Sequence, residues 1–143
     1  MMNQKALIFF ALFISSCCLV TTTSACPFYK TNWTVYITNQ VPDNIVVHIK
    51  STDHDLGNYT IAPTHVHSLT FCQKVVGTHF HGYFWWGSKY QSLALMDAEI
   101  IKKCRKRFAG NEYCYWLVRT DGFYLSASNQ PFPYGWVKKK AWP

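Results

Sequence analysis

Short runs of β-branched and aromatic residues, separated by turn-forming residues, cover most of the chain after residue 30. Strands are predicted over residues 33–38, 44–50, 59–61, 66–71, 78–86, 92–96, 113–119 and 122–126, with one more over 132–138. Breaks fall at residues 41–43, 55–57, 62–64 and 129–131, where Pro, Gly, Asn and Asp gather. Short strands at this spacing are typical of an antiparallel sandwich or barrel. We therefore predict a single all-β domain of about eight short strands.

Alternation along two of these strands predicts which side chains face the core. On one strand Ile45, Val47 and Ile49 share a face, and on another Phe80, Gly82, Phe84 and Trp86 do so. Residues 97–107 break the pattern and are expected to form a short helix or a charged excursion. The pair Asp121-Gly122 between two strand-like runs indicates a two-residue hairpin loop, in which both turn positions need positive φ.

The first 25 residues have the order of a secretory signal peptide, with a short basic start, an uncharged apolar run over 6–20 and the small residues Thr23-Ser24-Ala25. The apolar run is shorter than the roughly 20 residues that a membrane-spanning helix needs. We expect cleavage after Ala25, a mature domain over 26–143 that starts at Cys26, and an extracellular location without stable membrane insertion. The alternatives are an uncleaved interfacial anchor and a lipoprotein attached through Cys26.

Of the six cysteines, Cys17 and Cys18 belong to the leader, and four remain in the mature chain: Cys26, Cys72, Cys104 and Cys114. An even number in a secreted chain implies two disulfides, for which three pairings are open. Zinc is the rival use of four cysteines, but no Cys-x-x-Cys pair is present.

Basic residues outnumber acidic ones, 14 to 7, and Lys5 leaves with the leader, so the mature domain carries 13 against 7, a net charge of +6. They cluster around Cys104 and near the end of the chain: Lys102, Lys103, Arg105, Lys106 and Arg107, then Lys138, Lys139 and Lys140. Such clusters favour loose attraction to acidic wall or membrane surfaces, or a specific acidic receptor surface. Nucleic acid is disfavoured by the compartment. The first cluster is our candidate partner-binding loop.

Two sequons, Asn32-Trp33-Thr34 and Asn58-Tyr59-Thr60, fit a secreted chain. They predict N-glycosylation at Asn32 and Asn58, which requires both side chains to be exposed.

Two His-x-His pairs, His65/His67 and His79/His81, have a spacing that can chelate zinc or copper. No carboxylate lies near enough in sequence to orient the imidazoles, so we favour solvent-facing strand residues and expect no metal or other cofactor. The run 81–85 is similar to the His-Gly-Leu-Trp core of T2 ribonucleases, but the second histidine motif of that chemistry is missing. Since Gly-x-Ser-x-Gly is also absent, we expect no enzymatic activity.

Five blocks in order resemble the plant self-incompatibility S1 family, the S-protein homologues. They lie at residues 35–39, 47–57, 80–87 and 93–97, with a closing signature formed by Cys104, 114–118 and 121–124. The resemblance covers about residues 33–136. It implies a small, secreted, monomeric, antiparallel β-sandwich that carries no catalytic activity and signals by binding a cell-surface receptor protein through its loops. The alternative from a different class is a basic secreted defence or toxin-like protein that acts on membranes.

The resemblance also bears on the cysteines. The family usually has cysteine where this chain has Ile49 and Gly82, which implies that these two cysteines pair in the family. Our hypothesis is that Ile49 fills the volume of that bridge against the space left by Gly82. Cys26 and Cys72 stand outside the family pattern, so the implied pairs are Cys26–Cys72 and Cys104–Cys114. The second pair would close a small loop that holds the basic cluster as a fixed protrusion.

Overall fold

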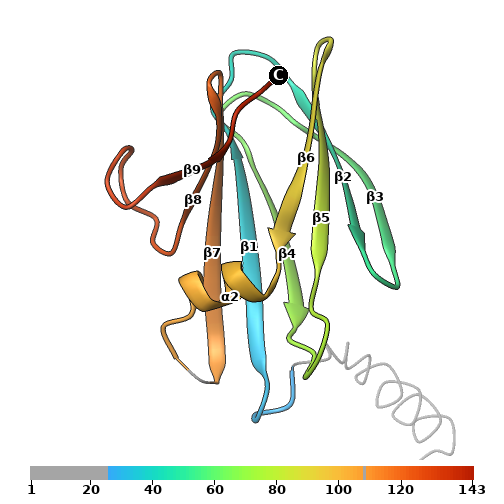
Figure 1. The fold of residues 1–143 in the computed structure, drawn as a ribbon, viewed down its shortest axis with the longest axis vertical. Coiled ribbons are helices and arrows are strands. Elements are labelled where there is room, and N and C mark those ends of the chain that lie inside the picture. The colour runs from blue at the N-terminus through green and yellow to red at the C-terminus, as the bar shows by residue number, and fades with distance from the viewer. Residues whose placement is uncertain (1–25, 108) are drawn as a thin grey trace, which may run out of the picture.

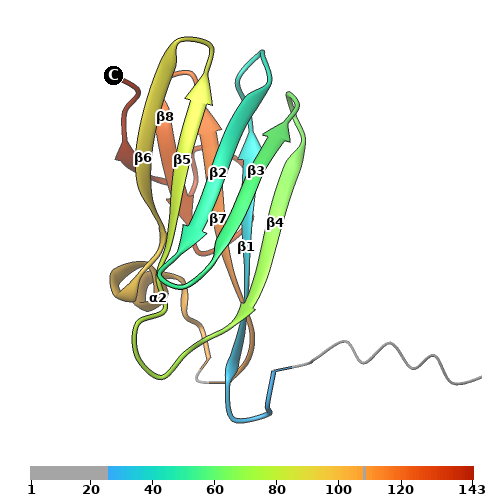
Figure 2. The same cartoon turned by 90° about the vertical axis from the view of Figure 1, so that its right-hand side faces the viewer.

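The computed structural model describes residues 26–107 and 109–143, and the predicted signal peptide, residues 1–25, lies outside the described residues. Two β-sheets pack face to face as a sandwich (Figure 1 and Figure 2). The five-stranded sheet has the order β4-β1-β7-β8-β9, and the four-stranded sheet has the order β3-β2-β5-β6. The strands are β1 (Thr31–Asn39), β2 (Ile45–Ser51), β3 (Asp55–Ile61), β4 (Val66–Cys72), β5 (Phe80–Trp86), β6 (Lys89–Met96), β7 (Gly110–Arg119), β8 (Gly122–Ser126) and β9 (Val137–Lys140). The predicted all-β sandwich is confirmed.

One pairing departs from the antiparallel expectation, because β1 and β7 run parallel from Thr31 opposite Gly110 to Asn39 opposite Val118. Between these two strands the chain forms β2 and β3 of the other sheet, returns to form β4, and then forms β5 and β6 of the other sheet and helix α2 (Ala98–Cys104). The helix follows β6 at the end of the sandwich where β1 begins (Figure 1). The next strand therefore starts at that same end and runs in the direction of β1. The ambiguous segment 97–107 thus contains a helix, with Asp97 accepting a hydrogen bond from the backbone N–H of Ile100 as its N-cap.

The predicted hairpin forms between β7 and β8, but its loop is shifted by one residue. Arg119 pairs with Gly122, so Thr120 and Asp121 make the turn, and of the three only Gly122 has positive φ, at 146°. A Cβ on Gly122 would lie 2.2 Å from the carbonyl oxygen of Lys140, so glycine is needed there for the close approach of β9. The last predicted strand, over residues 132–138, is shorter and lies later in the chain: β9 covers Val137–Lys140, and residues 132–135 form a turn.

The core lies between the sheets and matches the predicted faces. Ile45, Val47 and Ile49 are fully buried, while the alternate residues of β2 are partly or fully exposed. Two buried indoles have partners for their N–H groups: Trp116 donates to the carbonyl of Leu95 at 3.0 Å, and Trp33 donates to the side chain of Gln73 at 2.9 Å. No helix within the described ranges is long and apolar enough to cross a membrane.

Candidate functional site

Several connecting segments meet at one end of the sandwich, the lower end in Figure 1. We call it the loop end and define it as residues 26–30, the β2–β3 turn at 52–54, the β4–β5 loop at 73–79, and residues 98–107 of α2 and its exit. Loops placed on a rigid β-scaffold are where binding residues concentrate. The whole of the first basic cluster lies in these segments, and each of the two disulfides has one of its cysteines there.

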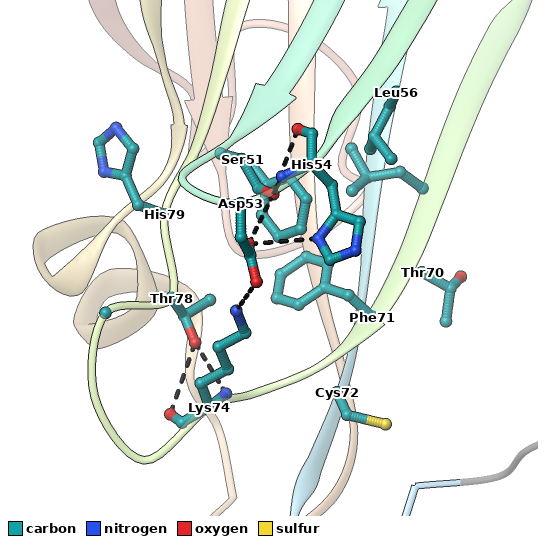
Figure 3. Close-up of a pocket in the computed structure, with 13 residues that line it drawn as sticks. Ser51, Asp53, His54, Leu56, Thr70, Phe71, Cys72, Lys74, Thr78 and His79 are labelled. Atoms are coloured by element: carbon teal, nitrogen blue, oxygen red, sulfur yellow. Dashed lines mark hydrogen bonds and ion pairs between the residues drawn. The ribbon is translucent and has the colours of Figure 1, made fainter.

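A pocket of about 260 Å³ opens between the two sheets at the loop end (Figure 3). Its apolar wall includes Leu69, Phe71 and Phe80, and the two phenyl rings lie 4.4 Å apart between centroids. Lys74 and Asp53 line the same pocket and form an ion pair of 2.5 Å. Hydrogen bonds from Lys74, then from His54 and Ser51, hold the pKa of the Asp53 carboxyl well below its ordinary range. The ion pair joins the β4–β5 loop to the β2–β3 turn.

A second hollow, of about 610 Å³, separates the β4–β5 loop from α2. Lys74, Lys102 and Arg105 contribute the cationic groups of its lining, and Val75, Ala98 and Ile101 contribute apolar groups. The Arg105 guanidinium donates to Gln73 Oε1 at 2.5 Å, and this oxygen also accepts the Trp33 indole hydrogen bond. Arg105 is therefore tied to β1 through Gln73, and its Nε is buried without a hydrogen-bond partner in the described chain.

This contact divides the candidate partner-binding loop. Lys102 and Lys103 are exposed in the last turn of α2, where cations stabilise the helix, and Arg105 is half-buried against Gln73. Lys106 and Arg107 follow the helix and are exposed. The five residues predicted as one loop are thus two helical cations, one inward-facing arginine and two cations in an extended segment.

The extended segment is held from beneath by a buried acid. The Glu112 side chain is only 2% exposed, and its Oε1 accepts hydrogen bonds from the backbone N–H of Lys106, at 3.1 Å, and from that of Arg107. The Cys104–Cys114 disulfide joins the same segment to β7, with a Cα–Cα distance of 5.5 Å. The backbone of residues 104–107 is therefore fixed while the Lys106 and Arg107 side chains remain outside.

The second disulfide joins Cys26 to Cys72, with a Cα–Cα distance of 5.5 Å, and so ties residues 26–30 to the end of β4. These are the two pairs that the family resemblance implied.

The histidine pairs do not meet. His65 and His67 lie at the start of β4 in the five-stranded sheet, and His81 lies on β5 in the other sheet. His67 stacks on Tyr59 with a centroid distance of 4.0 Å, and burial lowers its pKa. The ring centroids of His79 and His81 lie 5.9 Å apart. The pKa of His81 is lowered by burial and, to a smaller extent, by the nearby charges of His79 and Lys140. Across residues 26–107 and 109–143, no group of three His, Cys, Asp or Glu side chains could hold a metal ion.

The two sequons lie on outward strand positions. Asn58 is exposed on β3, whereas Asn32 is half-buried on β1 and donates from Nδ2 to Asn111 Oδ1 at 3.1 Å. Asn58 is thus the more accessible acceptor, and glycosylation at both positions stays a prediction.

Sequence reasoning missed the apolar side chains of the loop end. Phe28, Tyr29, Val75 and Val76 are exposed by 94%, 67%, 93% and 84% respectively, and we call these two pairs the apolar tips. The available signal was the pair of valines between Lys74 and Gly77, outside every predicted strand. Exposed apolar side chains that gather in one part of a surface can mark an interaction site.

Comparisons with known proteins address the family and the fold of this chain. The family model for plant self-incompatibility protein S1 matches residues 34–139. A search of curated proteins gives no match. A structural match has a TM-score of 0.53 and 14% sequence identity, and covers 82% of this chain and 98% of the other. It is described as the structure of SPH (Self-Incompatibility Protein Homologue) proteins, "a widespread family of small, highly stable, secreted proteins from plants". At 14% identity the structural match supports the fold alone. The family model spans most of the sequence and shows that this chain belongs to the plant self-incompatibility protein S1 family.

Proposed function

We propose that the protein is a secreted, non-enzymatic ligand that binds a cell-surface receptor protein through its loop end. The carrying observation is the basic segment after α2, whose backbone is fixed by Glu112 and by the Cys104–Cys114 disulfide while Lys106 and Arg107 stay exposed. A pre-organised segment loses little conformational entropy when it binds, and its cations favour an acidic partner surface.

Three further features support this interpretation. Secretion agrees with the signal-peptide pattern of residues 1–25, with the two disulfides and with the secreted character of the structurally similar SPH proteins. The family model describes proteins of plant self-incompatibility, which is a recognition process. The sequence contains none of the nucleophile or acid–base motifs considered above. In the pocket that Asp53 and Lys74 line, these two residues form an exposed ion pair.

The test is binding of labelled protein to intact plant cells at physiological salt. Lys106→Ala/Arg107→Ala removes two charges from the loop end, and Lys138→Ala/Lys139→Ala removes two from β9 as a matched control. Wild-type binding should saturate, and its saturable part should disappear when surface proteins are removed by protease. The loop variant should raise Kd by roughly tenfold and the control by less than about twofold. Equal effects of the two variants, or binding that never saturates, would refute a specific receptor contact.

The membrane-acting alternative is favoured by one observation, the apolar tips beside the cations of the loop end. It predicts salt-sensitive leakage of lipid vesicles, which a receptor ligand would not cause.

A further inference from the structure

We propose that the loop end docks on the surface of an anionic lipid bilayer, with the apolar tips inserted among the headgroups and the neighbouring cations set against lipid phosphates. The proposal concerns lipid alone and does not require the receptor contact proposed above. It rests on three features of the described residues: apolar exposure, local charge and the shape of the loop end.

The first feature is the apolar exposure. Single exposed apolar side chains are ordinary on protein surfaces, but here four of them project from two segments joined by one disulfide. Cys72 ends β4 just before the β4–β5 loop that carries Val75 and Val76, and its partner Cys26 lies just before Phe28. The disulfide therefore keeps both apolar tips at the same end of the molecule (Figure 1).

The base of the valine tip is fixed, so the valines are presented and do not fold back. The backbone N–H of Lys74 donates to Thr78 Oγ1 at 2.8 Å, and the backbone N–H of Gln73 donates to the carbonyl of Thr31 at 2.9 Å. The Asp53–Lys74 ion pair adds a tether on the other side. A loop held at its base loses little further freedom when its tip enters an interface.

The second feature is charge. Lys102 lines the same hollow as Val75, and Lys103, Lys106 and Arg107 continue the exposed cations along the loop end. Three acids in or beside this end are already engaged: Asp53 with Lys74 and His54, Asp97 with the N-terminus of α2, and Glu112 with the basic segment. Glu99, in the first turn of α2, is exposed and partly offsets the positive charge of these cations. Cations beside exposed apolar groups are what binding to anionic lipid surfaces requires.

The third feature is shape. The apolar tips are protrusions, and hollows of about 450 and 610 Å³ lie beside them. A protein partner would need matching pockets and ridges across this relief, whereas a fluid headgroup layer accommodates it. Each tip has only two apolar residues, a reach that suits the interfacial region and falls far short of the hydrocarbon core. The structure therefore points to peripheral docking without a pore.

The test is flotation of the secreted, disulfide-bonded protein with phosphatidylcholine vesicles prepared with and without phosphatidylserine. Wild type should float with the anionic vesicles, stay behind with the zwitterionic ones and release no entrapped dye. Val75→Ser/Val76→Ser should weaken binding by about tenfold. Val66→Ser/Val137→Ser, which changes two exposed valines outside the loop end, should bind like wild type. Lys102→Ala/Lys103→Ala should weaken binding and flatten its salt dependence.

The following outcomes overturn the proposal. If wild type does not bind anionic vesicles, the proposed lipid contact does not exist. If the Val75/Val76 variant binds them as tightly as wild type, the valines make no such contact. Dye release replaces peripheral docking with membrane disruption. If the valine variant loses binding to cells while wild type ignores protein-free vesicles, the apolar tips serve the protein receptor, so the lipid proposal fails and the receptor proposal stands. Thermal unfolding of every variant confirms that each is folded.

Discussion

Ile49 of β2 and Gly82 of β5 lie directly opposite each other in the four-stranded sheet, and both are buried. Facing Cβ atoms of antiparallel strands lie about 4.5–5.5 Å apart, close to the separation that a disulfide bridges. The positions where the S1 family usually has cysteine are thus placed for the bridge that the resemblance implied. The three heavy atoms nearest to the missing Cβ of Gly82 belong to Phe84 and Leu95, so these two side chains also occupy the space over Gly82.

Gly82→Ala should therefore destabilise the protein. A Cβ at this position would lie 2.6 Å from Phe84 Cε2 and 2.9 Å from Leu95 Cδ1, so both side chains must move. Alanine normally gains about 0.5–1 kcal/mol over glycine inside a strand, but overpacking a core costs about 1–3 kcal/mol and should win. Urea unfolding measures the difference. In a Leu95→Ala background the same substitution should cost less, and an unchanged cost would show that Leu95 is not the obstacle.

Strand faces were predictable because each depends on a local alternation, as in Ile45, Val47 and Ile49. The parallel pairing of β1 with β7 was not, because it depends on where a distant helix returns the chain. The same limit applies to the basic cluster. Arg105 was predicted to be displayed, but it contacts Gln73, a residue 32 positions away, whose side chain also satisfies a buried indole. Such contacts become visible only when the strands are placed in space.

Asn39 should be among the most sensitive polar positions. It is fully buried at the end of β1, where Nδ2 donates to the carbonyls of Asp43 and Ile61 at 2.8 and 2.9 Å and Oδ1 accepts from Val41 N at 2.9 Å. Asn39→Ala leaves three backbone groups without this partner, and we expect a loss of about 2–4 kcal/mol in unfolding free energy. Asn129→Ala at an exposed position is the matched control and should change stability by less than about 0.5 kcal/mol. Equal losses in the two variants would contradict the role of the hydrogen bonds.

Acidification should weaken the edge between β3 and β4, where His67 stacks on Tyr59. Burial lowers the pKa of His67 in the folded state, so the unfolded chain takes up this proton first. The unfolding free energy therefore has its full value at pH values above 6.5, the ordinary pKa of histidine. It falls as the pH drops below that value, because the unfolded chain is protonated more readily than the folded one. Urea unfolding at about pH 7.5 and about pH 5 should show the loss, and His67→Phe should reduce it. His81, whose pKa is shifted in the same direction, should account for part of the remainder.

The two disulfides should differ in their response to a mild reductant. Cys104 and Cys114 are fully buried, whereas Cys72 is exposed and Cys26 is half-buried, so a reducing thiol reaches the Cys26–Cys72 bridge first. Brief reduction followed by alkylation and peptide mass analysis should find Cys26 and Cys72 modified before the other pair. Cys26→Ala/Cys72→Ala should cost about 2–4 kcal/mol, since the bridge closes a chain separation of 46 residues. The Cys104–Cys114 bridge closes a separation of only 10, yet Cys104→Ala/Cys114→Ala should cost at least as much, because it also removes two buried sulfur atoms from the core. Simultaneous alkylation of all four cysteines would contradict the ordering and would indicate that both bridges open through global unfolding.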